Sequence, residues 1–347
     1  MQKSLSSLLR FMIPLSLAVV LLYFAFRNVE FADFISRITE VDYKWVIASI
    51  LLSLLTYLAR AYRWNILLKP LDYQPTIFRT SLAVLVGYLA NLAFPRLGEI
   101  TRCAALKRTD DVPVPVSIGT VISERIFDAF TLLLMIAVSL LLEYDLIVAF
   151  MNETLSDYNL NFTKILIGIG ILAAVAVAIF VIFFIQENKY SVRVREFLRE
   201  LYGGLSSIRR ISNIWGFVIS SLVLWVSYYL MSYLIVFSLE ETSFLSVSAG
   251  FMLLVTGGIA LALPVQGGIG TYHTMVTAML ALYGISKSTG LFLATLLHTS
   301  QILAIAVFGG IALLITVAIS RKKNESNEIK NSNSEGSRDS GSKVEER

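Results

Sequence analysis

Two arginines and a glutamate surround an interruption in an otherwise apolar stretch. Arg96, Glu99 and Arg102 are spaced at i, i+3 and i+6, so on a helix that begins after Pro95 adjacent members lie one turn apart. Gly98 permits close approach of the backbone there. The unpaired N–H groups of a helix amino terminus and the forks of arginine both bind phosphate. The sequence therefore predicts an anion site. The alternative is a turn at headgroup level, with both arginines extended to water.

A second group of charges lies inside an apolar run. Glu124 and Asp128 are spaced at i and i+4, and Arg125 is adjacent to Glu124. Ionisable residues inside membrane spans are costly, pair with one another and mark functional sites. We expect Arg96 or Arg102 to pair with the two carboxylates. The alternative is a buried ion pair that only fixes the register of the helices.

Glycines form a third motif. Gly267, Gly268 and Gly270 follow Pro264, and His273 lies one turn further along. No strand is expected before them and no Lys–Ser/Thr pair follows, which argues against a nucleotide-binding loop. Such glycines let the backbone approach a ligand or a neighbouring helix. His273 can titrate near neutral pH; its alternative role is that of a hydrogen-bonded structural residue.

Other polar and aromatic residues fit ordinary positions at a membrane surface. Arg60 and Arg63 lie one turn apart near the expected cytoplasmic end of a helix. We expect them to extend to the interface or to bind anionic lipid headgroups. Trp64, Trp225 and Tyr228 are expected to be interfacial or packing aromatics.

The composition is that of a multi-span membrane protein. Of 347 residues, 56% are hydrophobic and 16% are charged, whereas soluble domains contain about 25% charged residues. The single cysteine, Cys103, excludes an intramolecular disulfide and a cysteine metal cluster. With two histidines, a histidine-ligated metal is not expected either. We predict no metal, no cofactor and no nucleic-acid partner.

Apolar runs that approach the length of about 20 residues needed for a span occur six times. They are Phe11–Phe26, Trp45–Tyr62, Val116–Leu142, Thr163–Ile185, Ile214–Leu239 and Thr289–Ile319. No small-residue cleavage site follows the first run, so we expect it to be a retained span and not a signal peptide.

Two further apolar stretches are broken by proline. Thr80–Leu106 is interrupted at Pro95, and Phe244–Tyr283 is interrupted at Pro264. Proline lacks a donor and clashes with the preceding turn, so each stretch is predicted to be helix–break–helix. Leu-Ala-Phe-Pro in the first stretch returns as Leu-Ala-Leu-Pro in the second. Broken helices in corresponding positions of two halves are typical of a transporter's substrate site.

The distribution of charge predicts the orientation of the spans. Lysine and arginine are concentrated in Arg60–Arg79 and Gln186–Asn213, whereas Glu143–Phe162 has neither. Positive loops stay in the cytoplasm, so both termini are expected inside. The two interrupted stretches would then enter the membrane from opposite faces as re-entrant hairpins.

The predicted fold is an all-α polytopic membrane protein with about six full spans, two re-entrant broken-helix hairpins and an inverted repeat. We expect a transmembrane domain over residues 1–320, with halves at about 1–142 and 163–320. Residues 321–347 are polar and are expected to form a disordered cytoplasmic tail.

Three motifs together resemble a known family. Asn91–Arg102, Ser123–Asp128 and Pro264–Gly270 are similar to the signatures of the lysylphosphatidylglycerol synthase transmembrane region, also called the flippase-like or UPF0104 family. The resemblance covers Phe11 to about Ile319. In the best-understood members this region is joined to a soluble aminoacyl-transferase domain that makes lysyl-lipid, and the membrane part is held to flip that lipid. No such domain follows here, so synthase activity is not implied. Many members carry an acidic residue where this chain has His273, so a cationic substrate is not implied.

These observations predict a translocase of a lipid or polyprenyl-linked lipid with a phosphate-containing headgroup, without catalysis of its own, in the bacterial inner membrane. Its partner is that lipid, and a homo-oligomer is left open. Two alternatives remain: an accessory or enzyme in lipid-linked glycosyl transfer or envelope lipid modification, and an ion-coupled carrier of small anions. The residues expected to contact substrate are Arg96, Gly98, Glu99, Arg102, Glu124, Arg125, Asp128, Pro264, Gly267, Gly268, Gly270 and His273. The arginines would bind phosphate, the carboxylates would balance them or take protons, and the glycines would admit the headgroup.

Overall fold

The computed structural model describes residues 23, 35–94, 97–155, 167, 170–171, 211, 213–263 and 265–345. Every regular element within these residues is helical, as the composition and the apolar runs predict. Four helices within the described residues are long and apolar enough to cross a membrane. They are α3 (Tyr43–Leu68), α6 (Val114–Leu142), α10 (Ile214–Val236) and α13 (Lys287–Glu345), of which the part up to Lys323 is the candidate span. The expected spans Phe11–Phe26 and Thr163–Ile185 lie almost entirely outside the described residues.

Polar residues begin these helices where the apolar runs start. The side chain of Asp42 accepts the backbone N–H of Lys44 at 3.2 Å, and Asn213 accepts that of Gly216 at 2.9 Å. Each bond satisfies a donor that the first turn of a helix leaves unpaired. The Lys44 ammonium also lies 2.5 Å from Asp42 and holds the pKa of that carboxyl below its ordinary value. The cap of α3 is therefore charged at neutral pH.

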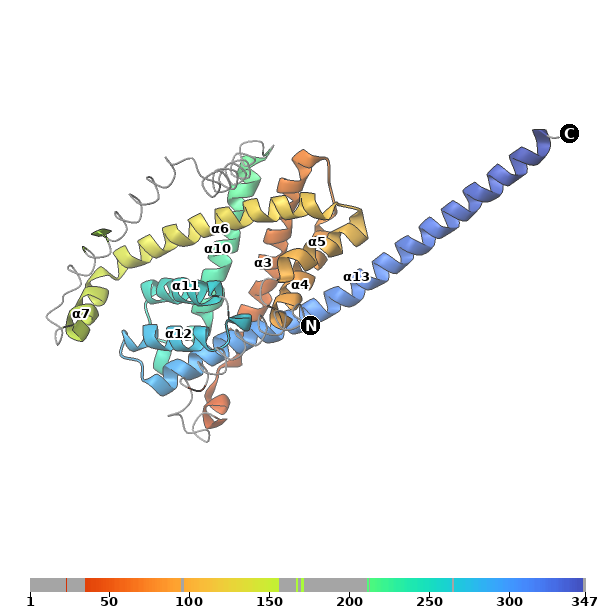
Figure 1. Ribbon diagram of the computed structural model, residues 1–347. Helices are drawn as coiled ribbons and strands as arrows, with labels where there is room; N and C mark the ends of the chain where they lie inside the picture. The colour runs from red at the N-terminus through yellow and green to blue at the C-terminus, as the bar shows by residue number, and fades with distance from the viewer. Residues whose placement is uncertain are drawn as a thin grey trace, which may run out of the picture.

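The two central helices, α3 and α10, run antiparallel along each other (Figure 1). At one end the backbone N–H of Asp42, just before α3, donates to the carbonyl of Ser238, just after α10, at 2.9 Å. Further along, the Ser49 hydroxyl donates to the carbonyl of Met231 at 2.9 Å. Nearer the other end Arg63 reaches the Ser221 hydroxyl at 3.3 Å. Residues early in one helix thus meet residues late in the other.

The first interrupted stretch forms two helices, α4 (Ile77–Ala93) and α5 (Leu97–Asp110). Phe94, between them, has extended backbone angles and ends α4. The helices pack closely where Gly87 of α4 faces Gly98 of α5, because a Cβ on Gly87 would lie only 2.8 Å from the carbonyl oxygen of Gly98. At 17 and 14 residues, both helices are shorter than the about 20 residues of a typical span.

The second interrupted stretch forms α11 (Val247–Ala262), a 3-10 turn η6 (Gln266–Gly268) and α12 (Thr271–Ala281). Gly267, Gly268 and Gly270 all have positive φ angles of 58–86°. Side chains with a Cβ rarely adopt this conformation, so the glycines allow the chain to turn between the helices. Both predicted breaks are present as helix boundaries. Their re-entrant placement in a membrane stays a prediction.

The first helix of each interrupted stretch has a similar set of neighbours. Helix α4 packs against α3, α5 and α13, while α11 packs against α10, α12 and α6. The turn η6 also contacts α4, so the second break lies against the first hairpin.

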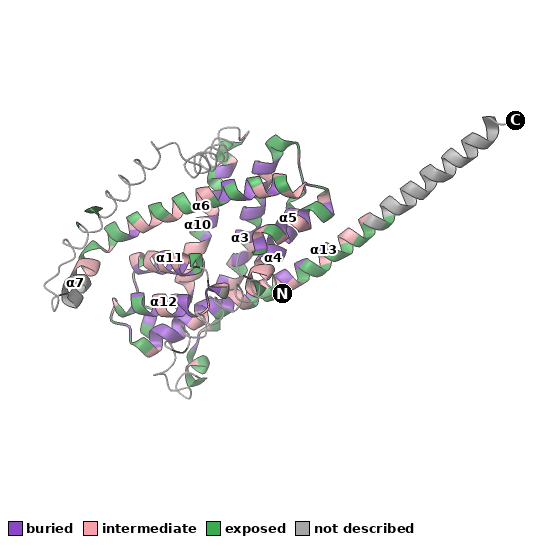
Figure 2. Cartoon of the chain, in the orientation of Figure 1, coloured by how far each residue is buried: buried purple, intermediate pink, exposed green. Residues whose placement is uncertain are grey.

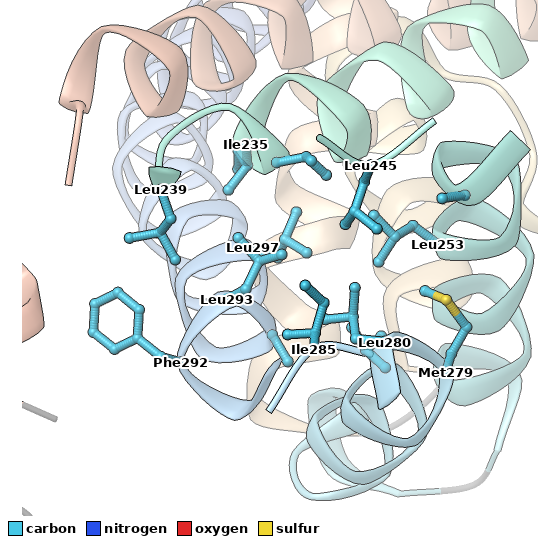
Figure 3. Packing of buried hydrophobic residues seen from close by; sticks show 14 of the residues in the cluster. Ile235, Leu239, Leu245, Leu253, Met279, Leu280, Ile285, Phe292, Leu293 and Leu297 are labelled. Carbon is cyan, nitrogen blue, oxygen red and sulfur yellow. The ribbon is translucent and has the colours of Figure 1, made fainter. Parts of the chain in front are cut away.

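A large apolar core joins α10, α11, α12 and α13. It includes Leu239, Leu253, Leu280 and Leu293, which point toward one another in Figure 3. Burial is concentrated in α3, α4, α5 and α12, whereas one face of α6 carries exposed apolar side chains such as Leu133 and Leu141 (Figure 2). That face is suited to contact with lipid.

Two elements were not expected from the sequence. A short helix, α7 (Tyr144–Leu155), follows α6 in the segment that we assigned to a loop. Helix α13 continues through the polar residues after Arg321 to Glu345 and extends beyond the other helices (Figure 1). The division into a transmembrane domain and a disordered tail over 321–347 stays a prediction.

Candidate functional site

Helix α3 brings two arginines into the interior. The side chain of Arg60 is 4% exposed and that of Arg63 is fully buried. We expected these residues to extend to the interface, and that expectation is wrong. Residues three apart share one face of a helix, and this face of α3 is turned toward α6 and α10, where carboxylates are available.

Glu124 of α6 is the centre of the cluster. One carboxylate oxygen accepts from Arg60 at 2.6 Å and from Arg63 at 2.8 Å. The other oxygen accepts from Arg102 of α5 at 3.0 Å. The Glu124 side chain is completely buried. The pairing of Arg102 with Glu124 that the sequence predicted is therefore present, together with two arginines that the prediction did not include.

Asp128, one turn after Glu124, adds a second carboxylate. It lies 2.8 Å from Arg63 and 3.4 Å from Arg60. Arg125 lies 3.8 Å from Asp128 and 3.5 Å from Glu99 of α5. Four arginines and three carboxylates thus meet between α3, α5 and α6, and positive charge is in excess.

Aromatic side chains surround these guanidinium groups. Trp64 stacks under Arg102, with 4.7 Å between the guanidinium carbon and the ring centroid. The Tyr228 hydroxyl of α10 accepts from Arg60 at 3.0 Å and lies 3.4 Å from the hydroxyl of Tyr88. Sequence reasoning treated Trp64 and Tyr228 as interfacial or packing residues. Trp64 lies four residues after Arg60 in α3, and this spacing was the only feature of the sequence that placed Trp64 near the cluster. No local pattern in the sequence indicated that Tyr228 would contact Arg60.

A small pocket opens beside the cluster at the break between α4 and α5. Its polar lining includes Arg60, Arg102, Arg125, Glu99 and Asn91. The pocket volume is about 10 Å³, which is enough for one water-sized group.

The amino terminus of α5 faces this pocket through Gly98. Its backbone N–H donates to the Asn91 side chain at 2.7 Å. Among the described residues, the site thus combines a helix amino terminus, three guanidinium groups and one carboxylate around the contact between Gly87 and Gly98.

Several donors of the cluster have no acceptor. The Nε atoms of Arg60, Arg63 and Arg102 are buried and have no hydrogen-bond partner within the described part of the chain. Buried donors without an acceptor are costly, and an anion can supply acceptors to several of them at once. The excess of positive charge in the cluster would also be balanced by an anion.

The glycines and His273 of the second hairpin form a separate group. His298 of α13 is hydrogen-bonded through Nε2 to the carbonyl of Gly267 at 2.8 Å and stacks on Tyr272. The ring of His273 lies 5.1 Å from that of His298 and accepts the N–H of Gly270 at 3.4 Å.

The structure therefore divides the predicted site residues into two groups. Gly98, Glu99, Arg102, Glu124, Arg125 and Asp128 come together around the pocket or its ion pairs. Gly267, Gly268, Gly270 and His273 lie at the second break, and none of them lines that pocket. Arg96 and Pro264 lie outside the described residues.

Comparisons with known proteins agree with the motifs. Residues 11–309 match the family described as the lysylphosphatidylglycerol synthase TM region. The chain is 21% identical over 338 residues to glycosyltransferase AglD of Haloferax volcanii, an alignment that covers 88% of this chain and 53% of that protein. It is also 21% identical over 295 residues to the UPF0104 membrane protein MJ1595 of Methanocaldococcus jannaschii, with 78% of this chain and 84% of that protein covered. The chain thus spans about half the length of the AglD protein. No solved structure matches it.

Proposed function

Because the chain belongs to the lysylphosphatidylglycerol synthase transmembrane-region family, we propose that it is a translocase of a lipid or polyprenyl-linked lipid whose phosphate binds beside Arg102. The match over residues 11–309 confirms the resemblance of the three motifs to this family. The proposal assigns no bond-making step to the protein. It concerns the movement of a headgroup across the membrane.

The observation that carries the proposal is the pocket at the break between α4 and α5. Three arginines contribute to its lining, and buried guanidinium donors next to it lack acceptors. A phosphate presents several acceptor oxygens and matches the fork of arginine. A non-helical stretch at membrane depth is tolerated where it lines a cavity, so a broken helix is a suitable place for a headgroup.

Movement of the headgroup requires the pocket to enlarge, because it now holds only a water-sized group. The contact between Gly87 and Gly98 gives α4 and α5 a close interface at that point. In our proposal α5 moves relative to α4 and admits the headgroup, and the second hairpin makes the equivalent movement from the opposite side. The antiparallel α3 and α10 and the matching neighbours of the two halves support an inverted repeat of this kind.

A second candidate function is a non-catalytic membrane role in lipid-linked glycosyl transfer. The name of the relative AglD, a glycosyltransferase, favours it. The phosphate site would then hold a lipid-linked substrate for another protein or domain. This function needs the same site but no transport.

A lipid transport assay with purified protein in vesicles separates these functions. The assay follows fluorescent anionic phospholipid and polyprenyl-phosphate analogues, with a neutral diacylglycerol analogue as control. We expect the wild-type protein to move phosphate-bearing analogues, and Arg102→Lys to fold but lose most of that transport, since lysine cannot form a two-pronged contact with phosphate.

The matched control is Arg79→Lys. Arg79 pairs with Asp110 at 3.0 Å at the carboxyl-terminal end of α5 and does not line the pocket, so transport should stay near the wild-type rate. If folded wild-type protein moves none of several headgroups, with or without a proton gradient, the translocase proposal fails and the glycosyl-transfer role leads.

A further inference from the structure

Two buried histidines lie at the second break, away from the pocket beside Arg102. His273 and His298 are each 6% exposed, and they are the two histidines of the chain. The centroids of their rings, on α12 and α13, lie 5.1 Å apart. Histidine ordinarily changes its charge near neutral pH, and histidines inside transporters carry protons.

His298 has one ring nitrogen bound to the break and the other able to take a proton. Its Nε2 lies 2.8 Å from the carbonyl oxygen of Gly267. A carbonyl only accepts, so Nε2 carries the hydrogen and neutral His298 has a lone pair on Nδ1. A proton added at Nδ1 would keep the bond to Gly267 and strengthen it, because the donor then carries a charge.

The ring of Tyr272 offers a second contact to a charged His298. The two rings are stacked, with 4.9 Å between their centroids and 15° between their planes. An aromatic face attracts a cation within about 6 Å. His273 suits the proton less well, because its Nδ1 accepts the N–H of Gly270 and an imidazolium accepts no hydrogen bond. Two charged rings this close would repel each other, so the pair holds one proton on His298.

The helices around this pair supply no carboxylate to it. Helices α10, α11 and α12 contain no Asp, Glu, Lys or Arg, and α13 contains none between Lys287 and Arg321. Helix α4 has Arg79 in its first turn, paired with Asp110. The charged residues of α3 and α5 belong to the cluster around Glu124 or lie at helix ends. A bound proton would thus meet a carbonyl and an aromatic ring, and it would not be trapped in an ion pair.

We propose that His298, with His273 beside it, is a proton-binding site that couples proton movement to opening of the second break. The bond from His298 to Gly267 ties α13 to η6. This bond is stronger while the proton is present, so loss of the proton favours separation of the turn from α13. The inference rests on the proposed function, to which it adds a proton as the driving ion.

Histidine NMR tests the proton site without any transport. The full chain, without a histidine tag and labelled with 15N and 13C at histidine, gives two ring signals because it has two histidines. Between about pH 5 and 8.5 we expect one signal to titrate, with a 15N shift at Nδ1. His298→Gln, whose amide can still donate to Gly267, should remove the titrating signal. His273→Gln, whose amide oxygen can still accept from Gly270, should leave it in place.

Accumulation of lipid tests the coupling. Vesicles with purified protein and a fluorescent anionic phospholipid are given a pH difference of about one unit, and valinomycin with potassium clamps the membrane potential. One proton moved per lipid would change the final ratio of the lipid between the two leaflets by up to about tenfold. An effect of pH on the rate alone would leave that ratio unchanged.

The variants of α13 then separate coupling from general effects. With His298→Gln the final leaflet ratio should be the same with and without the pH difference. The exposed Lys287, the first residue of α13, provides the control Lys287→Gln, which should keep the wild-type response.

The outcomes separate the inference from the proposed function. It is overturned if neither histidine signal of the wild-type protein titrates, if the titrating signal belongs to His273, or if the wild-type leaflet ratio ignores the pH difference. The translocase proposal survives each of these results as long as lipid moves. If no lipid moves, the proposed function and the coupling fail together, and the titration of His298 alone decides the proton site. The wild-type titration keeps this decision open to test even where a variant does not fold.

Discussion

The charges of Arg60, Arg63 and Arg102 are all balanced in part by the two oxygens of Glu124. Each arginine reaches that carboxylate from α3 or α5, so one side chain of α6 connects α6 to both of these helices. Removing one partner of a buried pair leaves the other charge without compensation. Glu124 therefore matters more to the folded state than any single arginine around it.

We predict that Glu124→Gln lowers the free energy of unfolding by about 3–5 kcal/mol. Arg102→Gln should cost less, because Arg60 and Arg63 still hold Glu124. The double variant should be clearly less destabilised than the sum of the two single variants, as measured by thermal unfolding in detergent.

Additive effects of Glu124→Gln and Arg102→Gln would contradict the pairing. The control pair is Asp42→Asn with Lys44→Gln. Their ion pair is exposed at the start of α3, and exposed pairs contribute little, so these two changes should have small effects.

Spacing predicted some residue contacts and missed others. Arg102 and Glu124 were matched because each lay in an apolar context that requires a partner. Arg60 and Arg63 have the same helical spacing, yet their nearness to a helix end suggested exposure to headgroups. Which face of α3 turns inward depends on packing against α6 and α10, and no local pattern in α3 contains that information.

At the scale of elements, the close contact between α4 and α5 depends on two glycines. A Cβ on Gly98 would lie 2.6 Å from the side-chain carbon of Asn91. We predict that Gly98→Ala forces the two helices apart and lowers both the unfolding temperature and lipid binding. Thermal unfolding and native mass spectrometry measure the two effects.

Gly119→Ala in α6 is the matched control. A Cβ there meets no atom within 4 Å, and alanine favours a helix by about 1 kcal/mol over glycine. The control should be neutral or stabilising. A Gly98→Ala protein with wild-type stability and lipid binding would refute the role of this contact.

Helix positions followed from the apolar pattern more reliably than contacts did. Proline and glycine end helices through their own backbone geometry, so both breaks were predicted from sequence and lie where expected. Helix α7 was missed because its segment has no lysine or arginine and looked like an outer loop. The glycines after Pro264 were predicted to share one site with Arg102, and this stays a prediction: none of them lines the pocket beside Arg102, although their turn η6 contacts α4.

At the scale of the whole molecule, α3 and α10 pack antiparallel, as the predicted inverted repeat of two halves requires. We predict that the hairpins enter from opposite faces. In a Cys103→Ser background, Lys107→Cys should react with an impermeant thiol reagent only from the cytoplasmic side, and Glu240→Cys only from outside. Both positions are exposed.

Labelling in intact cells and in inverted vesicles measures this orientation. Cys103 is buried, and the Cys103→Ser parent should show no labelling from either face. Reaction of both introduced cysteines from one face would refute the inverted arrangement.

The shared carboxylate also has a consequence for how the chain is made. Helix α3 leaves the ribosome first with two arginines, and Glu124 follows only after α4 and α5 have been synthesised. An arginine at the centre of a lone helix costs about 2.5–3.5 kcal/mol to insert, and Arg60 and Arg63, which lie nearer the carboxyl-terminal end of α3, would have to extend to the interface while Glu124 is absent. We therefore expect α3 to remain at the insertion machinery, or near the membrane surface, until α6 arrives. Biogenesis of this protein would then depend on the order of synthesis, and an early-terminated chain that ends before α6 should be degraded.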